Sequence, residues 1–327
     1  MPARVRALPW IAGFVLLGAV APASAQSSVG GPAQASFAGP ARANFVSPPR
    51  DPEPPEALPD LFSSVNLIDD ALPRTMLRLR GNLASGFRRP TMGELFQPKG
   101  GLPFSPGPPR PETNIDYQEM ETHLEYAVDT WFSVFLETPV RWLNPEQNAN
   151  TWGQGDASLG CKLCVFQTET FLTTFQLRLY TPTARNNALG TDHWTIEPGL
   201  LANFRLADMF TLEGELRYIA PLGGTDFAGD VLRYGIGLSL GQQPANQIWV
   251  TPVVEAVGWS FLGGKALAVA PGFVGIESLS GETVVNGQAG LRLGLGHSAD
   301  FYAGYSHSLT GPRLYRDMVR VEFRLQF

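Results

Sequence analysis

The last ten residues of the chain alternate strictly between two chemical classes. From Val319 onward the odd positions carry Val, Val, Phe, Leu and Phe, whereas the even positions from Met318 carry Met, Arg, Glu, Arg and Gln. Successive side chains of a β-strand point to opposite faces, so this segment has one wholly apolar face and one that is almost wholly charged or amide. The same period of two recurs in many segments beyond residue 72. The pattern predicts an all-β protein, but alternation alone does not decide which solvent meets the apolar face.

The N-terminus has the three parts of a secretory signal peptide. Arg4 and Arg6 form a basic start, residues 7–21 are almost uninterruptedly apolar, and Ala23-Ser24-Ala25 is a small-x-small cleavage site. We therefore expect residues 1–25 to be cleaved after Ala25 and the protein to be exported. No later stretch approaches the ~20 apolar residues of a transmembrane helix, which excludes an α-helical membrane protein.

Composition favours a membrane barrel. Only 17% of the residues are charged, against about 25% in typical soluble proteins. Without the signal peptide, 22 basic and 30 acidic residues remain, a net charge of −8, which argues against nucleic acid as a partner. Cys161 and Cys164 would point to opposite faces of a strand, and no His or second Cys pair lies nearby. We interpret both as ordinary strand residues, and we expect no metal and no cofactor.

Segments with period-two alternation predict about twelve strands. We place them at 74–84, 116–128, 130–139, 155–166, 168–180, 192–205, 208–220, 229–241, 246–259, 282–296, 298–309 and 315–327. Tight links alternate with longer ones, as periplasmic turns and external loops do in outer-membrane barrels. The first and the last link between strands are both long and hence external. If the N-terminus is periplasmic, the C-terminus is then periplasmic too, which requires an even number of strands. The apolar stretch 266–276 is therefore assigned to an external loop, as an extended ribbon, and not to a thirteenth strand.

These patterns predict a transmembrane antiparallel up-and-down β-barrel over residues 73–327, with both termini in the periplasm. Residues 26–72 read as a disordered leader rich in Pro, Ala and Ser, with a short amphipathic helix over 61–72 as an option. The alternative is an exported soluble β-sandwich. Aromatic residues near strand ends, typical of the girdles of membrane barrels, disfavour it: Trp131, Phe132, Trp142, Trp194, Trp249, Trp259, Tyr302 and Tyr305.

The chain also resembles known outer-membrane proteins. A final strand that ends in Phe327 resembles the assembly signal of bacterial outer-membrane β-barrels, which implies the barrel-assembly machinery and outer-membrane lipid as partners. The chain further resembles a group of uncharacterised bacterial outer-membrane barrels, related to the transporter family associated with the meta-pathway of phenol degradation. The stretches that carry this likeness include PRTMLRLRG (73–81), TNIDYQEMETHLEYA (113–127), GGTDFAGDVLRYGIGLS (223–239) and GPRLYRD (311–317). The resemblance implies transport but names no substrate.

If the apolar faces meet lipid, the opposite faces line the lumen. The predicted lumen-lining and selectivity residues are Arg78, Arg80, Glu119, Glu121, His123, Glu125, Arg178, Glu213, Glu215, Arg217, Arg320, Glu322 and Arg324. Closure would place the first strand between the second and the last, so basic residues would face carboxylates across the seam. Such a wall is either an interior neutralised by cross-strand ion pairs or a hydrated channel whose field filters solutes.

The sequence therefore predicts an outer-membrane channel for passive passage of small molecules, among them hydrophobic or aromatic ones. The alternative is a closed barrel with a structural or surface-interaction role. A barrel hydrolase is a third class, but no catalytic residues are predicted. Ser306 and His307 are neighbours on opposite strand faces and cannot pair, and Asp192 and His193 form an isolated acid–histidine pair. The placement of loop 85–115, inside or outside the lumen, stays open.

Overall fold

The computed structural model describes residues 62–87, 110, 112, 114–184, 188–207, 209–241, 247–270, 273–311 and 313–327. The predicted signal peptide, the leader at 26–60 and most of loop 85–115 lie outside these residues.

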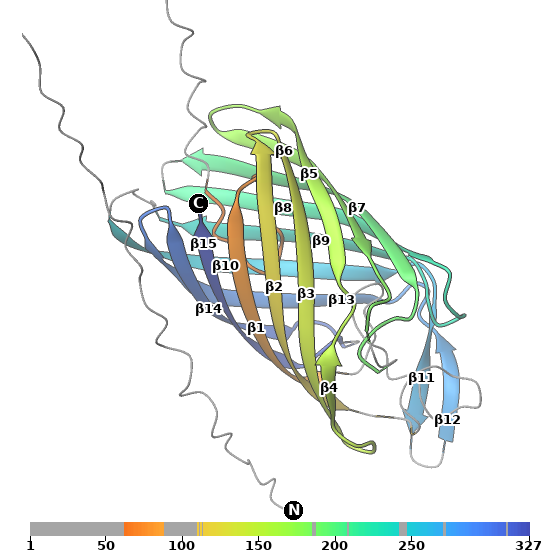
Figure 1. Cartoon of the computed structure of the whole chain (residues 1–327). Helices are drawn as coiled ribbons and strands as arrows, with labels where there is room; N and C mark the ends of the chain where they lie inside the picture. The colour runs from red at the N-terminus through yellow and green to blue at the C-terminus, as the bar shows by residue number, and fades with distance from the viewer. Residues whose placement is uncertain are drawn as a thin grey trace, which may run out of the picture. The chain divides into compact units, whose positions relative to one another are not determined.

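Twelve long antiparallel strands close into a barrel within the described residues (Figure 1). They are β1 (Met76–Phe87), β2 (Ile115–Asp129), β3 (Phe132–Pro145), β5 (Ser158–Gln167), β6 (Phe171–Tyr180), β7 (Trp194–Ala207), β8 (Phe210–Leu222), β9 (Val231–Leu240), β10 (Ile248–Phe261), β13 (Thr283–Leu295), β14 (Ala299–Ser308) and β15 (Asp317–Gln326). The sheet closes because β1 pairs with both β2 and β15, so that Met76 lies opposite Glu125 on one side and Gln326 on the other. Closure leaves no unpaired sheet edge in lipid. The predicted strand number and up-and-down topology are confirmed.

The barrel has a tight-turn end and a long-loop end. At the tight-turn end, β2 is followed by β3, β5 by β6, β7 by β8, β9 by β10, and β13 by β14. At the other end, β4 (Thr151–Gln154) extends the wall beside β3. There β11 (Lys265–Ala270) and β12 (Phe273–Ser278) form a separate two-stranded hairpin, which confirms that 266–276 is a loop ribbon and not a wall strand. A hydrogen bond of 2.8 Å from Lys265 ties this hairpin to Asp226 and lowers the pKa of the Asp226 carboxyl.

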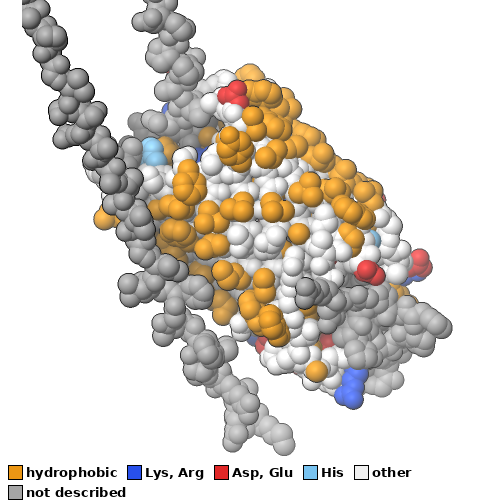
Figure 2. All heavy atoms as spheres, viewed as in Figure 1, with side chains coloured by type: hydrophobic (Ala, Val, Ile, Leu, Met, Phe, Trp, Pro, Cys, Tyr) orange, Lys and Arg blue, Asp and Glu red, His pale blue; other side chains and the backbone are white. Residues whose placement is uncertain are grey.

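In the barrel wall, apolar side chains are exposed and charged side chains are buried, which is the reverse of a soluble protein. On β8, Leu216 is 48% exposed, whereas its neighbours Glu215 and Arg217 are 5% and 1% exposed. Figure 2 shows apolar side chains spread over the outer face and charged ones near its ends. A soluble fold buries Leu and exposes Glu and Arg, so this surface suits hydrocarbon and the β-sandwich alternative is wrong. No helix in the described part of the chain is long and apolar enough to cross a membrane.

The predicted aromatic girdle is only partly formed. Trp131, Trp142 and Trp194 are exposed on the outer surface, as expected. In contrast, Trp259 and Tyr302 are buried at 6% and 0% exposure. Both side chains contact lumenal arginines, so they belong to the interior and not to the lipid interface. An aromatic residue near a strand end belongs to the girdle only when its position in the alternation points its side chain to the outer face of the barrel.

Residues 62–72 lie inside the barrel, and we call this segment the plug. It forms no helix, so the helix considered over 61–72 is wrong. Phe62 lies against His297 of the β13–β14 turn, with ring centroids 4.3 Å apart, so the plug begins at the tight-turn end. It reaches into the lumen as far as Leu67 and returns to Ala71, whose carbonyl accepts a 2.6 Å hydrogen bond from Thr174 of β6. No helix forms because wall side chains take up the peptide groups that a helix would pair internally.

Candidate functional site

The candidate site is the lumen wall together with the plug. The thirteen predicted lumen residues all lie at inward positions of their strands; Glu121 is half-buried and the others are buried. Their placement on the inner face follows from strand parity. Whether any of them sets selectivity stays a prediction.

Ion pairs cross the seam where the barrel closes. Arg80 contacts Glu322 of β15 at 2.9 Å and Glu121 of β2 at 3.3 Å. Arg78 contacts Glu137 of β3 at 2.9 Å. Basic residues of β1 therefore face carboxylates on both sides, as the alternation predicts. Breaking such a buried pair would leave an uncompensated charge, which is strongly destabilising.

His123 belongs to this seam. Its Nδ1 lies 2.8 Å from Glu137 and its Nε2 lies 3.2 Å from Glu125. Lys162 of β5 contacts the same Glu125 carboxylate at 2.8 Å. Both ring nitrogens of this buried imidazole therefore have partners, which is the arrangement of a structural histidine.

A second charged cluster centres on Asp69 of the plug. Its carboxylate lies 2.5 Å from Arg178 and 2.7 Å from Arg217. Arg217 also contacts Glu215 at 2.6 Å and Glu197 at 2.9 Å. The plug thus supplies a carboxylate to wall arginines on β6 and β8, which fixes the segment electrostatically.

Wall carboxylates hold the peptide N–H groups of the plug. Glu255 of β10 accepts hydrogen bonds from the backbone N–H groups of Asn66, Leu67 and Ile68 at 3.0, 2.7 and 3.0 Å. Glu213 of β8 accepts one from Ser64 at 3.1 Å. A hydrogen bond to an ionised group contributes about 1.5–3 kcal/mol. These two carboxylates therefore anchor the centre of the plug.

Wall arginines hold the plug carbonyls. Each of these bonds measures 2.7–3.0 Å: Arg324 to Ser63, Arg292 to Ser64 and Val65, Arg320 to Asn66, and Arg233 to Leu67. Wall carboxylates therefore accept hydrogen bonds from the N–H groups of the plug, and wall guanidinium groups donate to its carbonyls. Together they satisfy this irregular backbone as neighbouring strands would in a sheet.

The side chains of the plug fit into gaps on β9. A Cβ atom added at Gly235 would lie 2.5 Å from Ile68, and one added at Gly237 would lie 2.5 Å from Val65. Any larger residue at these two inward positions would overlap the plug. The spacing of the two glycines therefore matches the two apolar side chains that they receive.

Several lumen residues are absent from the sequence-based set. Glu137 and Arg141 of β3 and Asp300 of β14 are buried at inward positions. Strand parity alone would have found Glu137 and Asp300, whereas Arg141 lies beyond the end of the strand predicted at 130–139. Asp69 could not have been found this way, because it lies in a segment without period-two alternation.

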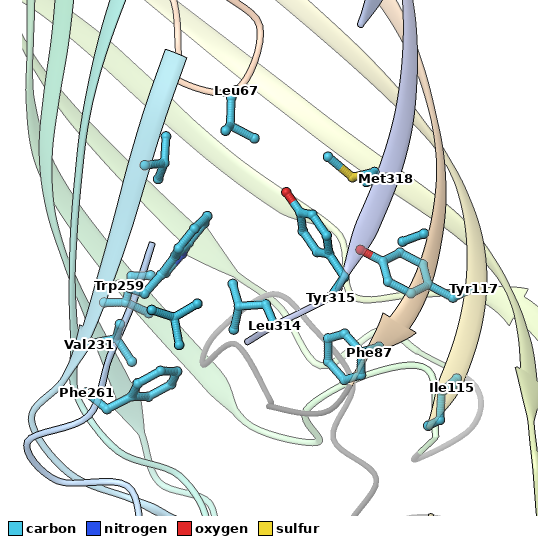
Figure 3. Close-up of a cluster of buried hydrophobic side chains, with 14 of the residues drawn as sticks. Leu67, Phe87, Ile115, Tyr117, Val231, Trp259, Phe261, Leu314, Tyr315 and Met318 are labelled. Carbon is cyan, nitrogen blue, oxygen red and sulfur yellow. The ribbon is translucent and has the colours of Figure 1, made fainter. Parts of the chain in front are cut away.

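A cavity of 80 Å³ lies between the plug tip and the long-loop end. Apolar and aromatic side chains form part of its lining, among them Leu67, Tyr117, Trp259 and Tyr315. Figure 3 shows these side chains in the barrel interior, with Leu67 pointing toward the rings of Trp259 and Tyr315. The lumen thus combines charged walls with an apolar pocket beside the plug.

The described residues contain neither a metal cluster nor a Ser–His pair in this region. No group of three or more His, Cys, Asp or Glu among them is arranged to hold a metal ion. Ser306 is buried and lies 3.0 Å from the hydroxyl of Tyr315, whereas His307 is exposed and contacts Asp317 at 2.8 Å. His193 lies 2.8 Å from the carbonyl of Thr191.

Comparisons with known proteins agree with this architecture. The family model described as "Putative MetA-pathway of phenol degradation" matches residues 113–274. The COG4313 outer membrane channel from Pseudomonas putida F1 has a TM-score of 0.52 at 11% identity, over 80% of this chain and 100% of that chain. The NanC porin has a TM-score of 0.47 at 10% identity, over 77% of this chain and 100% of that chain. No curated protein matches the sequence. The chain thus has the fold of outer-membrane β-barrels, and its residues 113–274 are similar to the family related to the phenol-degradation meta-pathway proteins.

Proposed function

We propose that this barrel is a channel for passive passage of small molecules, and that the plug closes its lumen until it shifts aside. The way in which the plug is held carries the proposal. Charged wall side chains bind its peptide groups, as Glu255 and Arg292 do. Water can replace these bonds when the plug leaves, because both the charged wall groups and the peptide groups of the plug are polar and can be hydrated. A plug embedded in an apolar core would have no such route.

The tight-turn end is proposed to face the periplasm. The barrel chain begins and ends there, since the N–H of Phe327 donates to the carbonyl of Thr75 at 3.0 Å. Outer-membrane barrels place short turns in the periplasm and long loops outside. The plug would then enter from the periplasmic side, and the hairpin of β11 and β12 would face the exterior.

A closed structural barrel is the second candidate. The saturation of the wall charges favours it, because Arg78, Arg80 and Arg217 each contact at least two carboxylates. Planar-bilayer recording separates the two candidates. We expect discrete conductance steps from the purified wild-type protein, and a consistently silent bilayer would support the closed barrel.

A disulfide across the plug tests the gating role directly. Cys164 lies inward on β5, opposite Thr174 of β6, whose hydroxyl holds the carbonyl of Ala71. Cys164 also packs against the cluster that contains Ala71. In Ala71→Cys, oxidation is expected to join the two cysteines and make channel openings rarer, and a reductant should reverse the effect.

The matched control is Ala71→Cys combined with Cys164→Ser, which leaves only the outward Cys161 as a possible partner. It should show no response to oxidation. Equal conductance of the oxidised and reduced single variant, after gel analysis confirms the cross-link, would show that the plug does not gate the channel.

A further inference from the structure

Arg320 differs from the other basic residues that line the cavity beside the plug. The cavity wall contains five basic and five acidic side chains. Four of the basic ones have a carboxylate partner: Arg80 with Glu121, Arg141 with Glu119, Arg178 with Asp69, and Arg233 with Glu215. Arg320 has no such partner among the described residues.

The hydrogen bonds of Arg320 go to neutral groups. Its Nε donates to the side-chain oxygen of Asn82 at 2.7 Å, and its Nη1 donates to the carbonyl of Asn66 at 2.8 Å. Its Nη2 has no partner among the described residues. The residue is only 8% exposed. Glu322, two positions along the same face, is taken by Arg80 and Arg292.

Two acidic residues of the cavity, Glu119 and Asp156, are held by donors other than Arg320. Glu119 accepts from Arg141 at 2.6 Å and from Asn82 at 3.0 Å. Asp156 accepts from the backbone N–H of Thr191 at 2.6 Å and from that of Ala184 at 3.1 Å. Asp156, like Arg320, has only neutral partners, but its carboxylate is held by these N–H groups, so Arg320 is the one basic side chain of this lining without a carboxylate contact among the described residues.

A buried, unpaired guanidinium strongly favours an anion. Burying a charge without a counter-charge is costly, and a charge-assisted hydrogen bond offsets that cost. Guanidinium geometry suits carboxylates in particular, because its N–H groups form a planar fork. The sheet neighbours of Arg320 are Asn82 and Gly304, so neither cross-strand neighbour offers a carboxylate.

The rest of the lining is suited to a flat apolar body. Trp259, Tyr117, Tyr315, Met318 and Leu314 share the cavity with Arg320, and Figure 3 shows their side chains grouped in one part of the interior. Arg233 already lies over Trp259, 5.5 Å from its ring centroid, which holds that ring in place. The cavity of 80 Å³ holds on the order of five water molecules, so the ligand must be small.

We propose that this cavity binds a small organic carboxylate, with its charge on Arg320 and its apolar body against Trp259 and Tyr315. The site deepens the proposed channel function, since it lies in the lumen beside the plug tip. It would select anionic over neutral solutes of the same shape. A solute bound there would also contact Leu67, and so would couple occupancy to the position of the plug.

Binding of propionate and of propionamide, its neutral analogue of the same size, tests the proposal. Calorimetry on the purified full-length mature protein in detergent is expected to show propionate binding at least about tenfold more tightly than propionamide. Arg320→Gln should weaken propionate binding by about tenfold or more and leave propionamide binding unchanged. Equal affinity of the wild type for both compounds would overturn the proposal.

Arg324→Gln is the matched control. Arg324 also donates to a plug carbonyl, that of Ser63, but it is paired with Asp300 and does not line the cavity. The control should keep propionate affinity within about twofold. A loss equal to that of Arg320→Gln would attribute the effect to the plug and overturn the site. If Arg320→Gln fails to fold, Arg320→Lys replaces it and should retain part of the preference for propionate over propionamide. Unchanged affinity in Arg320→Lys would count against the fork geometry and overturn the assignment to Arg320.

Binding in detergent does not depend on conduction. A protein that binds propionate but is silent in bilayers would contradict the channel function and leave this site intact. A protein that conducts but binds propionate and propionamide equally would contradict this site and leave the channel function intact.

Discussion

At the residue scale, the two wall carboxylates that hold the plug have neutral neighbours in the sheet. Glu213 lies between Asn203 and Gly237, and Glu255 lies between Gln288 and Gly237. Neither carboxylate has a basic partner across the strands, so each is available to the peptide N–H groups of the plug. Cross-strand pairing, which satisfies Glu121 and Glu322, is therefore not the only way in which this lumen neutralises its charges.

Glu255→Gln is expected to loosen the plug. The amide keeps the shape but removes the negative charge that three backbone N–H groups share, a loss of about 1–3 kcal/mol. Hydrogen exchange at Leu67 and Ile68 should accelerate by about ten- to a hundredfold, as monitored by mass spectrometry. Glu119→Gln, which alters a carboxylate bonded to Arg141 and Asn82 and not to the plug, should leave that exchange unchanged. Equal acceleration in both variants would contradict this role of Glu255.

At the element scale, β9 is adapted to receive the plug. Its outward positions carry large apolar residues such as Tyr234, Ile236 and Leu238, whereas the inward Gly235 and Gly237 leave space. The alternation that predicts this strand also shows small residues on its inner face. It does not show that a distant segment fills the space they leave.

Gly237→Ala is expected to displace the plug without unfolding the barrel. The new methyl group would lie 2.5 Å from Val65, and such overpacking typically costs about 1–3 kcal/mol. Limited proteolysis should then cleave within residues 62–72 faster than in the wild type, with unchanged β-sheet circular dichroism. Gly214→Ala, on β8, meets only the carbonyl of Gly235 at 3.5 Å and should behave as the wild type. A protease-resistant plug in Gly237→Ala would refute the steric argument.

At the scale of the whole molecule, closure depends on the last strand. β15 pairs with both β1 and β14, and Phe327 follows it, 81% exposed to the lipid side. The proposed role of Phe327 as an assembly signal concerns delivery to the membrane. It is separate from the stability of the closed wall, which depends on the strand ladders.

Deletion of Phe327 is therefore expected to lower the amount of folded barrel in the outer membrane several-fold. Heat-modifiable gel mobility of membrane fractions measures it. Phe301→Ala removes another exposed aromatic side chain, on β14 opposite Phe323 of β15, and this variant should assemble normally. If both variants assemble equally well, the terminal residue is not a specific signal.

Much of the fold followed from local periodicity. Strands such as β8 and β9 were placed within a few residues, because one face of each meets lipid and the other meets the lumen, which enforces a strict period of two. The inward charges followed from the same parity. Trp259 and Tyr302 were wrongly assigned to the outer aromatic girdle, because their position near strand ends was given more weight than the inward direction that the alternation assigns to them.

The sequence by itself determined the barrel, its strand number and the polarity of its two faces, because lipid imposes the same alternation on every strand. Only the tertiary structure decided where residues 62–72 lie and which charges they neutralise. That segment has no periodicity of its own, and its conformation is imposed by Glu213, Glu255 and the wall arginines, which come from strands far apart in the chain. The unpaired state of Arg320 likewise depends on closure, since only the finished ring of strands shows which carboxylates lie within its reach.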